Sequence, residues 1–247
     1  MKNLLLEITE NERIGEGLKR MRLRIGSMDA AAIRPGQFVN IRLDGLFLRR
    51  PISVCDVRGE ELTLVYKVVG EGTEKLSRKL PGEELDVLLP LGNGFSLAEC
   101  GERPLLIGGG VGTAPLLYLA EELLAKGIRP TVVMGFGSEK DIFLRTEFEA
   151  LGIEPVIATL DGSVGVKGFV TDAVRDMGYS YVYTCGPEPM LRAVYQTIRT
   201  SGQFSFEERM GCGFGACMGC SCRTVSGYKR ICKDGPVMRK EELLWED

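Results

Sequence analysis

The sequence has no histidine among its 247 residues, and this absence excludes several kinds of site. Without histidine there is no His-ligated zinc centre, no Rieske-type cluster and no Ser-His or Cys-His catalytic pair. The chain also has little net charge, −3 from 31 basic and 34 acidic residues. A nucleic-acid-binding domain usually has a basic face, so this balance argues against nucleic acid as a partner.

Long apolar runs are also missing. No apolar segment reaches the roughly 18–20 residues that span a bilayer, and the stretch at 4–6 is too short for the core of a signal peptide. We therefore expect a cytoplasmic protein without a membrane partner. Hydrophobic residues make up 44% of the chain, which is enough for the buried cores of two domains.

Cysteine, in contrast, is abundant and unevenly placed. Five of the eight cysteines fall between residues 212 and 232, while Cys55, Cys100 and Cys185 are scattered. A secreted disulfide scaffold would be shorter and would distribute its cysteines more evenly. A local group of cysteines predicts a metal site instead.

Residues 1–99 are expected to form a β-domain. Turn signals such as Arg34-Pro35-Gly36 and Pro81-Gly82 separate short β-rich runs, and several short strands at this spacing favour a barrel or sandwich. The predicted strands are 18–25, 37–43, 51–57, 61–69 and 84–89. One helix is expected at 73–79, ended by Pro81-Gly82.

Residues 100–202 show strand–helix alternation, which predicts a parallel sheet with crossover helices. The predicted strands are 104–107, 131–135, 155–160 and 181–184, and the predicted helices run up to Lys126, within 139–151, and over 169–177 and 187–201. Residues 203–247 form a third segment, with a strand-like run at 203–209, the cysteine group and a charged tail.

The cysteine spacing in this third segment is the most specific local signal. Cys212, Cys217 and Cys220 give C-x4-C-x2-C, which with a distal fourth cysteine is the plant-type [2Fe–2S] pattern. Cys232 and Cys222 compete as the fourth ligand. We favour Cys232 because Cys220 and Cys222 are too close in sequence to serve both irons. A zinc knuckle is the alternative, but it more often uses paired C-x2-C hooks, and only one is present.

Four other motifs are weak when taken singly. Gly108–Thr113 lies between a predicted strand and helix, where a dinucleotide phosphate meets helix N–H groups. Arg50-Pro51-Ile52-Ser53 offers a guanidinium for a pyrophosphate. In Gly70-Glu71-Gly72-Thr73, Thr73 is a predicted N-cap, and in Cys185-Gly186-Pro187, Pro187 suits the first turn of a helix.

Taken together and in this order, the motifs resemble the ferredoxin–NADP reductase superfamily. That resemblance implies an N-terminal flavin-binding antiparallel β-barrel followed by a nicotinamide-binding α/β domain. It places FAD at Arg50, Pro51, Ile52, Ser53, Val65, Tyr66, Lys67, Gly72 and Thr73. It places NAD at Gly108, Gly109, Gly110, Gly112, Thr113, Cys185, Gly186 and Pro187.

The cysteine-rich extension, with Arg230-Ile231-Cys232-Lys233-Asp234-Gly235-Pro236-Val237, resembles the electron-transfer subunits of NAD-dependent (class 1B) dihydroorotate dehydrogenases. That resemblance covers essentially the whole chain and makes Cys212, Cys217, Cys220 and Cys232 the cluster ligands. It implies electron flow from dihydroorotate through a partner's FMN, the cluster and FAD to NAD, in pyrimidine biosynthesis. The expected assembly is a heterotetramer with an FMN-containing catalytic subunit, because this chain has no acid–base set for dihydroorotate.

Other functions fit the same motifs. Related flavin and iron–sulfur subunits of a sulfhydrogenase, a sulfite reductase or a transhydrogenase would share the barrel and cluster, and a zinc-bearing adaptor is an alternative of another class. The choice between NAD and NADP also stays open at this point. Glu139 would repel a 2′-phosphate where Lys140 would attract one, and the resemblance favours NAD.

Overall fold

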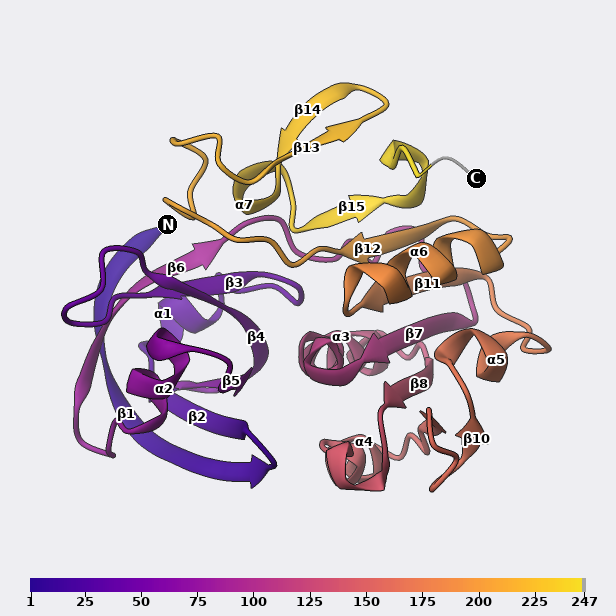
Figure 1. Ribbon diagram of the computed structural model, residues 1–247, viewed down its shortest axis with the longest axis horizontal. Helices are drawn as coiled ribbons and strands as arrows, with labels where there is room; N and C mark the ends of the chain where they lie inside the picture. The colour runs from indigo at the N-terminus through magenta and orange to yellow at the C-terminus, as the bar shows by residue number, and fades with distance from the viewer. Residues whose placement is uncertain (246–247) are drawn as a thin grey trace.

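Six antiparallel strands close into a barrel at the N-terminal end of the computed structural model, which describes residues 1–245 (Figure 1). The strands are β1 (Lys2–Gly15), β2 (Leu18–Arg24), β3 (Phe38–Ile41), β4 (Arg50–Arg58), β5 (Glu61–Lys67) and β6 (Glu84–Leu91), in the order β1-β2-β5-β4-β3-β6. Two short helices join them, α1 (Ser27–Ala30) and α2 (Glu71–Ser77). Along β6 every second residue is buried, the period-2 pattern of a strand with one face on a core.

The long strand β1 was not expected from the sequence. It pairs with β2 on one side and with β6 on the other, so it is the strand that closes the barrel. Its sequence mixes a leucine run with alternating charges, which gives no clean period-2 signal. The expected barrel is otherwise confirmed, although the helix α2 ends at Ser77, before Pro81-Gly82.

The second body is a seven-stranded sheet with helices on its faces. Its strands are β7 (Pro104–Gly109), β8 (Thr131–Phe136), β9 (Val156–Thr159), β10 (Val166–Lys167), β11 (Tyr181–Cys185), β12 (Gly202–Ser205) and β15 (Val237–Arg239), in the order β10-β9-β8-β7-β11-β12-β15. Its helices are η1 (Gly110–Thr113), α3 (Ala114–Ala125), η2 (Glu139–Asp141), α4 (Arg145–Ala150), α5 (Val170–Val174) and α6 (Glu188–Thr197). The central strand β7 is buried along its whole length, as expected for an apolar run covered on both faces.

The C-terminal segment is joined to this sheet rather than separate from it. β12 continues the parallel order beside β11, and β15 returns antiparallel to β12, with Ser205 opposite Val237. The predicted strand at 203–209 therefore ends at Ser205. Between these two strands lie the cysteine loop, the hairpin β13 (Ser221–Thr224) and β14 (Gly227–Arg230), and the short helix α7 (Ile231–Asp234). The helix η3 (Lys240–Glu242) follows β15.

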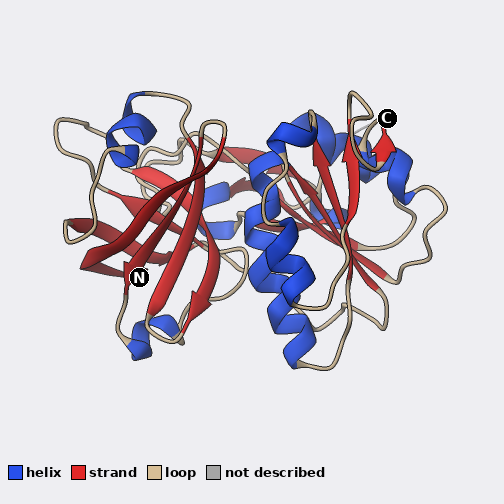
Figure 2. Cartoon of the chain, turned by 90° about the horizontal axis from the view of Figure 1, so that it is seen from below, coloured by secondary structure: helices blue, strands red, loops and turns tan. Residues whose placement is uncertain are grey.

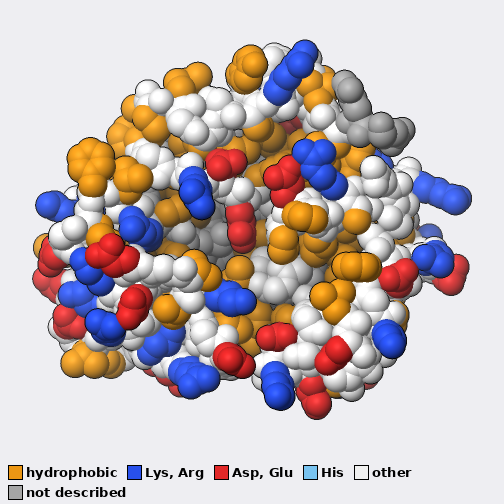
Figure 3. Space-filling model, viewed as in Figure 1, with side chains coloured by type: hydrophobic (Ala, Val, Ile, Leu, Met, Phe, Trp, Pro, Cys, Tyr) orange, Lys and Arg blue, Asp and Glu red, His pale blue; other side chains and the backbone are white. Residues whose placement is uncertain are grey.

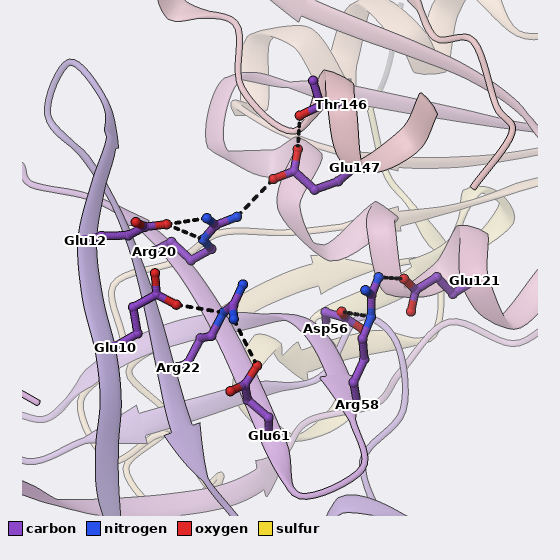
Figure 4. Close-up of polar contacts among 10 residues, drawn as sticks. All are labelled: Glu10, Glu12, Arg20, Arg22, Asp56, Arg58, Glu61, Glu121, Thr146 and Glu147. Carbon is purple, nitrogen blue, oxygen red and sulfur yellow. Dashed lines mark hydrogen bonds and ion pairs between the residues drawn. The ribbon is translucent and has the colours of Figure 1, made fainter. Parts of the chain in front are cut away.

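Helix α3 lies between the barrel and the parallel sheet, and Figure 2 shows it in this position. Polar contacts fix the two bodies across this boundary. The Tyr118 hydroxyl donates to the carbonyl of Ile33 (3.1 Å), and Arg20 pairs with Glu147 of α4 (3.0 Å). Arg58 bridges Asp56 on its own strand and Glu121 of α3 (Figure 4). The face seen in Figure 3 is hollowed between the two bodies.

Within residues 1–245, no helix combines the length and the apolar character that a membrane crossing requires.

Candidate functional site

A cavity of about 400 Å³ lies between the barrel and the α/β domain. Most of the predicted FAD residues line it, namely Pro51, Ile52, Ser53, Val65, Tyr66, Lys67 and Thr73. They come from the adjacent strands β4 and β5 and from helix α2, so the barrel brings them together although they are spread over 23 positions of sequence. On the other side the wall comes from Gly112, Pro115 and Cys185 of the α/β domain, and from Met210 and Pro236 beside the cysteine loop.

Arg50 and Gly72 lie next to this cavity rather than in its wall. A Cβ atom on Gly72 would stand only 2.1 Å from Nε of Arg50, so glycine is what lets the guanidinium lie against the start of α2. The expectation that Thr73 caps this helix is wrong. Gly70 is the N-cap. The Thr73 hydroxyl oxygen accepts hydrogen bonds from the backbone N–H groups of Val69 (2.9 Å) and Gly70 (3.2 Å).

A second cavity, of about 380 Å³, adjoins the first. Of the predicted NAD residues, Gly109, Gly110 and Pro187 line it, whereas Gly112 and Cys185 line the first cavity. The two cavities share Lys67 and Val111. A ring bound in the first cavity and a nucleotide bound in the second would therefore meet at these two residues.

The remaining glycines of the two motifs bring backbone segments close together. A Cβ atom on Gly108 would stand 2.7 Å from Oγ1 of Thr113, and one on Gly112 would stand 2.5 Å from the carbonyl oxygen of Cys185. The turn after β7 can therefore touch the turn after β11, where Gly186 has φ +158°. Pro187 is the N-cap of α6, one position before the predicted first turn. Burial raises the pKa of the Cys185 thiol to about 12, which keeps it neutral at physiological pH.

The four predicted cluster cysteines are arranged as two pairs. In the first pair, the N–H of Cys212 points to Sγ of Cys217, and the N–H groups of Ala216 and Cys217 point to Sγ of Cys212. In the second pair, the N–H of Cys232 points to Sγ of Cys220 at 3.4 Å. Two thiols for each iron, with backbone N–H groups aimed at sulfur, fit a [2Fe–2S] cluster.

The environment of the two pairs differs. Cys212 and Cys217 lie near the surface, and Cys220 and Cys232 are buried. Burial alone would raise the pKa of the Cys212 thiol, but backbone N–H groups of Cys217, Phe214 and Ala216 lower it to about 6. Burial and the neighbouring Cys220 raise the pKa of Cys232 to about 12.

The competing thiol, Cys222, is directed elsewhere. It lies on β13 with its Sγ 4.0 Å from Sδ of Met238, and it lines a separate cavity of about 280 Å³. This geometry favours Cys232 as the partner of Cys220. Among residues 1–245, no three or more His, Cys, Asp or Glu side chains are arranged around a single metal position.

Sequence reasoning missed several residues of these sites. Glu16 and Leu18, from the β1–β2 hairpin, line the second cavity together with Leu160 and Phe169, two exposed apolar side chains of the α/β domain. Phe38 of β3 lines the first cavity. No local motif marks any of them, because each reaches its site only through the packing of the two bodies.

Comparison with known proteins places this arrangement in a family. A model described as the iron–sulfur cluster binding domain of dihydroorotate dehydrogenase B matches residues 207–244, and one described as the oxidoreductase NAD-binding domain matches residues 106–196. The dihydroorotate dehydrogenase B (NAD(+)) electron transfer subunit of Geobacillus sp. (strain WCH70) is 43% identical over 99% of both chains. The chain belongs to this family of electron transfer subunits. The same subunit of Caldanaerobacter subterraneus subsp. tengcongensis is 45% identical over 85% of this chain and 87% of its own.

Solved structures agree with the fold. A structure of an NADH-dependent reduced ferredoxin–NADP oxidoreductase superposes with a TM-score of 0.88, at 32% identity over 99% of this chain and 91% of that chain. Phthalate dioxygenase reductase, with a TM-score of 0.67 and 19% identity over 93% of this chain and 77% of that one, shares the fold. These findings confirm the resemblance inferred from the motifs and the cofactor set that goes with it, FAD, [2Fe–2S] and NAD.

Proposed function

We propose that this subunit takes electrons from an FMN-containing catalytic subunit that oxidises dihydroorotate, and passes them through its cluster and FAD to NAD⁺. Bound FAD exchanges a hydride with a nicotinamide and single electrons with an iron–sulfur cluster. One observation carries the proposal. The first cavity touches the nucleotide cavity at Lys67 and Val111, and it touches the cysteine segment at Met210 and Pro236.

The residues of the first cavity hold and orient the flavin in this proposal. The adjacent strands β4 and β5 supply Ser53 and Tyr66 to the cavity wall, and Arg50 beside Gly72 supplies a fixed positive charge for the pyrophosphate. The neutral Cys185 thiol and Gly112 form part of the opposite wall, which also includes Glu207 and Glu208. A largely apolar wall excludes water from the place where the two rings meet.

The second cavity binds NAD rather than NADP in this proposal. Asp141 lines the cavity, and its carboxylate accepts hydrogen bonds from the N–H (2.9 Å) and hydroxyl (3.0 Å) of Ser138. A 2′-phosphate on the adenosine ribose would meet this negative charge. Neither Glu139 nor Lys140, which gave opposite expectations, lines the cavity.

The partner subunit covers the outer cysteine pair in this proposal. Two large apolar side chains of the cysteine loop, Phe214 and Met218, are 44% and 53% exposed. A docked catalytic subunit would bury them and shorten the path from its FMN. The expected assembly contains two copies of each subunit.

Co-expression with an FMN-containing dihydroorotate dehydrogenase subunit tests the function. The purified complex should show flavin and [2Fe–2S] absorbance and should reduce NAD⁺ with dihydroorotate, far faster than NADP⁺. In the isolated chain NADH should reduce the bound FAD, whereas dihydroorotate should be left unchanged. A colourless chain, or one that reduces ferredoxin with NADH and binds a different partner, would overturn the proposal.

A further inference from the structure

Asn40 is a buried polar residue of the barrel that contacts the cysteine loop. It lies on β3 and is 1% exposed. Its Nδ2 group donates to the carbonyl oxygen of Cys212 at 3.3 Å, across 172 positions of sequence. A barrel strand thus binds directly to the backbone of a proposed cluster ligand.

The adjacent glycine gives a second, independent sign of this contact. Gly213 has φ +79°, a left-handed conformation, and a Cβ atom on it would stand 2.3 Å from Nδ2 of Asn40. No side chain other than hydrogen fits between Asn40 and the loop at this point. The Cys212–Gly213 peptide is therefore shaped around the Asn40 amide.

The same strand also reaches the flavin cavity. Phe38, two residues earlier and on the same face of β3, lines that cavity and packs in one apolar group with Cys220 and Cys232. β3 pairs with β4, where Asn40 lies opposite Pro51 and Phe38 lies opposite Ser53. One short strand connects the flavin wall with the cysteine loop.

The buried position of the polar Asn40 side chain is unfavourable for stability. Within residues 1–245 its Oδ1 atom is buried without a hydrogen-bond partner, which lowers stability. A leucine of similar shape would avoid this loss at the contact between the barrel and the cysteine loop. The amide is therefore useful at this position through its N–H₂ group.

We propose that Asn40 is a positioning residue that fixes the cysteine loop to the flavin barrel and thereby sets the separation and the local polarity between flavin and cluster. Electron transfer slows steeply as two centres separate. A strand that holds the cysteine loop in place therefore also fixes the distance on which the transfer rate depends. By holding the loop, Asn40 also keeps the N–H groups of Ala216 and Cys217 directed at Sγ of Cys212, and N–H groups directed at sulfur stabilise a reduced cluster. This inference rests on the proposed function, because it takes Cys212 as a cluster ligand.

The test compares Asn40→Leu and Asn40→Asp with wild type in the complete subunit. Both variants should retain iron and should reduce flavin with NADH at the wild-type rate. Cluster reduction after flavin reduction should slow about 10-fold. The midpoint potential of the cluster should fall in Asn40→Leu and fall further in Asn40→Asp, because the second variant adds negative charge, and the EPR line shape should broaden.

Asn93 provides a matched control. Its Nδ2 group also donates to a backbone carbonyl of the C-terminal segment, at 2.9 Å, but this carbonyl belongs to Asp234 of α7 rather than to the cysteine loop, and Asn93 is exposed to solvent. Asn93→Leu should leave potential, EPR spectrum and transfer rate unchanged. Wild-type values in both Asn40 variants would overturn the inference while leaving the proposed function intact.

Loss of iron from the Asn40 variants would still give an answer. Hydrogen exchange of residues 211–219 would then be compared in iron-free wild type, Asn40→Asp and Asn93→Leu. Faster exchange only in the Asn40 variant supports the positioning role, and equal exchange contradicts it. A wild-type chain without iron would instead refute the proposed function.

Discussion

The two cysteine pairs lie in opposite surroundings. The outer pair, Cys212 and Cys217, is near the surface on a glycine-rich loop whose apolar side chains face solvent. The inner pair, Cys220 and Cys232, is buried in an apolar group with Phe38 of the barrel. Their local structure differs as well, because a loop holds the outer pair, whereas Cys232 is set in helix α7 and Cys220 immediately precedes β13.

This difference gives the proposed cluster site a buried side and a surface side. The packed apolar surroundings of the inner pair would hold its position relative to the barrel. The outer pair lies near the surface, where the proposed catalytic subunit would dock. A single electron carrier between two subunits needs both properties, and the protein divides them between the two halves of one site.

The largest expected effect is loss of the cluster, and it shows whether Cys232 or Cys222 is the fourth ligand. Cys232→Ser removes a thiolate from the inner pair and should abolish the cluster, since serine is a poor ligand for iron in this setting. Cys222→Ser changes a thiol that contacts Met238 instead, and it should retain iron and the visible spectrum. Iron analysis and EPR decide between them. Retention of the cluster in the Cys232 variant with its loss in the Cys222 variant would reassign the ligand.

The second prediction compares the stability effects of removing one phenylalanine near each cysteine pair. Phe38→Ala, behind the inner pair, should lower the free energy of unfolding by about 3–5 kcal/mol, because it opens a cavity in a packed core. Phe214→Ala, beside the outer pair, should change it by less than about 0.5 kcal/mol. Denaturant titration measures both. The Phe214 variant should instead weaken binding of the catalytic subunit, and equal stability losses would contradict the comparison.

The smallest effect concerns Arg230, which links the two halves. Its guanidinium donates to the carbonyl of Gly215 in the outer loop (2.9 Å) and to the carboxylate of Asp234 in α7 (3.0 Å). Hydrogen bonds from the Arg230 side chain and backbone hold the pKa of Asp234 below its usual value of 3.8. The stabilising contribution is therefore present above about pH 4 and is lost as the pH falls through the lowered pKa.

Asp234→Asn should accordingly reduce stability by no more than about 1 kcal/mol at pH 7, since the pair is partly exposed. The difference from wild type should shrink as the pH falls below about 4. Thermal unfolding at pH 7 and pH 3 measures it, with Asp172→Asn, which breaks an exposed pair with Arg175, as the control. An equal difference at the two pH values would show that the charge of Asp234 is not its cause.

The sequence predicts what is local in this molecule. Each of these features can be seen within a few neighbouring residues: four cysteines at a fixed spacing, a glycine turn after a buried strand, and a series of short strands. The cysteine loop, the parallel sheet and the barrel were therefore predictable, whereas the flavin residues were named only through the resemblance that the ordered motifs carry together. The competition between Cys222 and Cys232 needed the fold, because only the turn of α7 shows which thiol faces Cys220.

Contacts between distant segments could not be predicted in this way. Asn40 is an ordinary strand residue until the cysteine loop, far along the chain, packs on it. Glu16 and Phe169 come from different bodies and meet only at the nucleotide cavity. Strand β1 closes the barrel although its sequence has no clear alternation, because pairing with two neighbours outweighs its own pattern.

The pairing of β12 with β15 has a further consequence for how the protein is built. The chain leaves the sheet after Ser205 and returns opposite it at Val237, and the N–H of Phe206 bonds to the carbonyl of Pro236 at the point of departure. Residues 206–236, which carry all four proposed cluster cysteines, thus leave and rejoin the sheet at one pair of neighbouring strand ends. Because these two ends lie side by side, the length of the segment between them can change without moving β12 or β15.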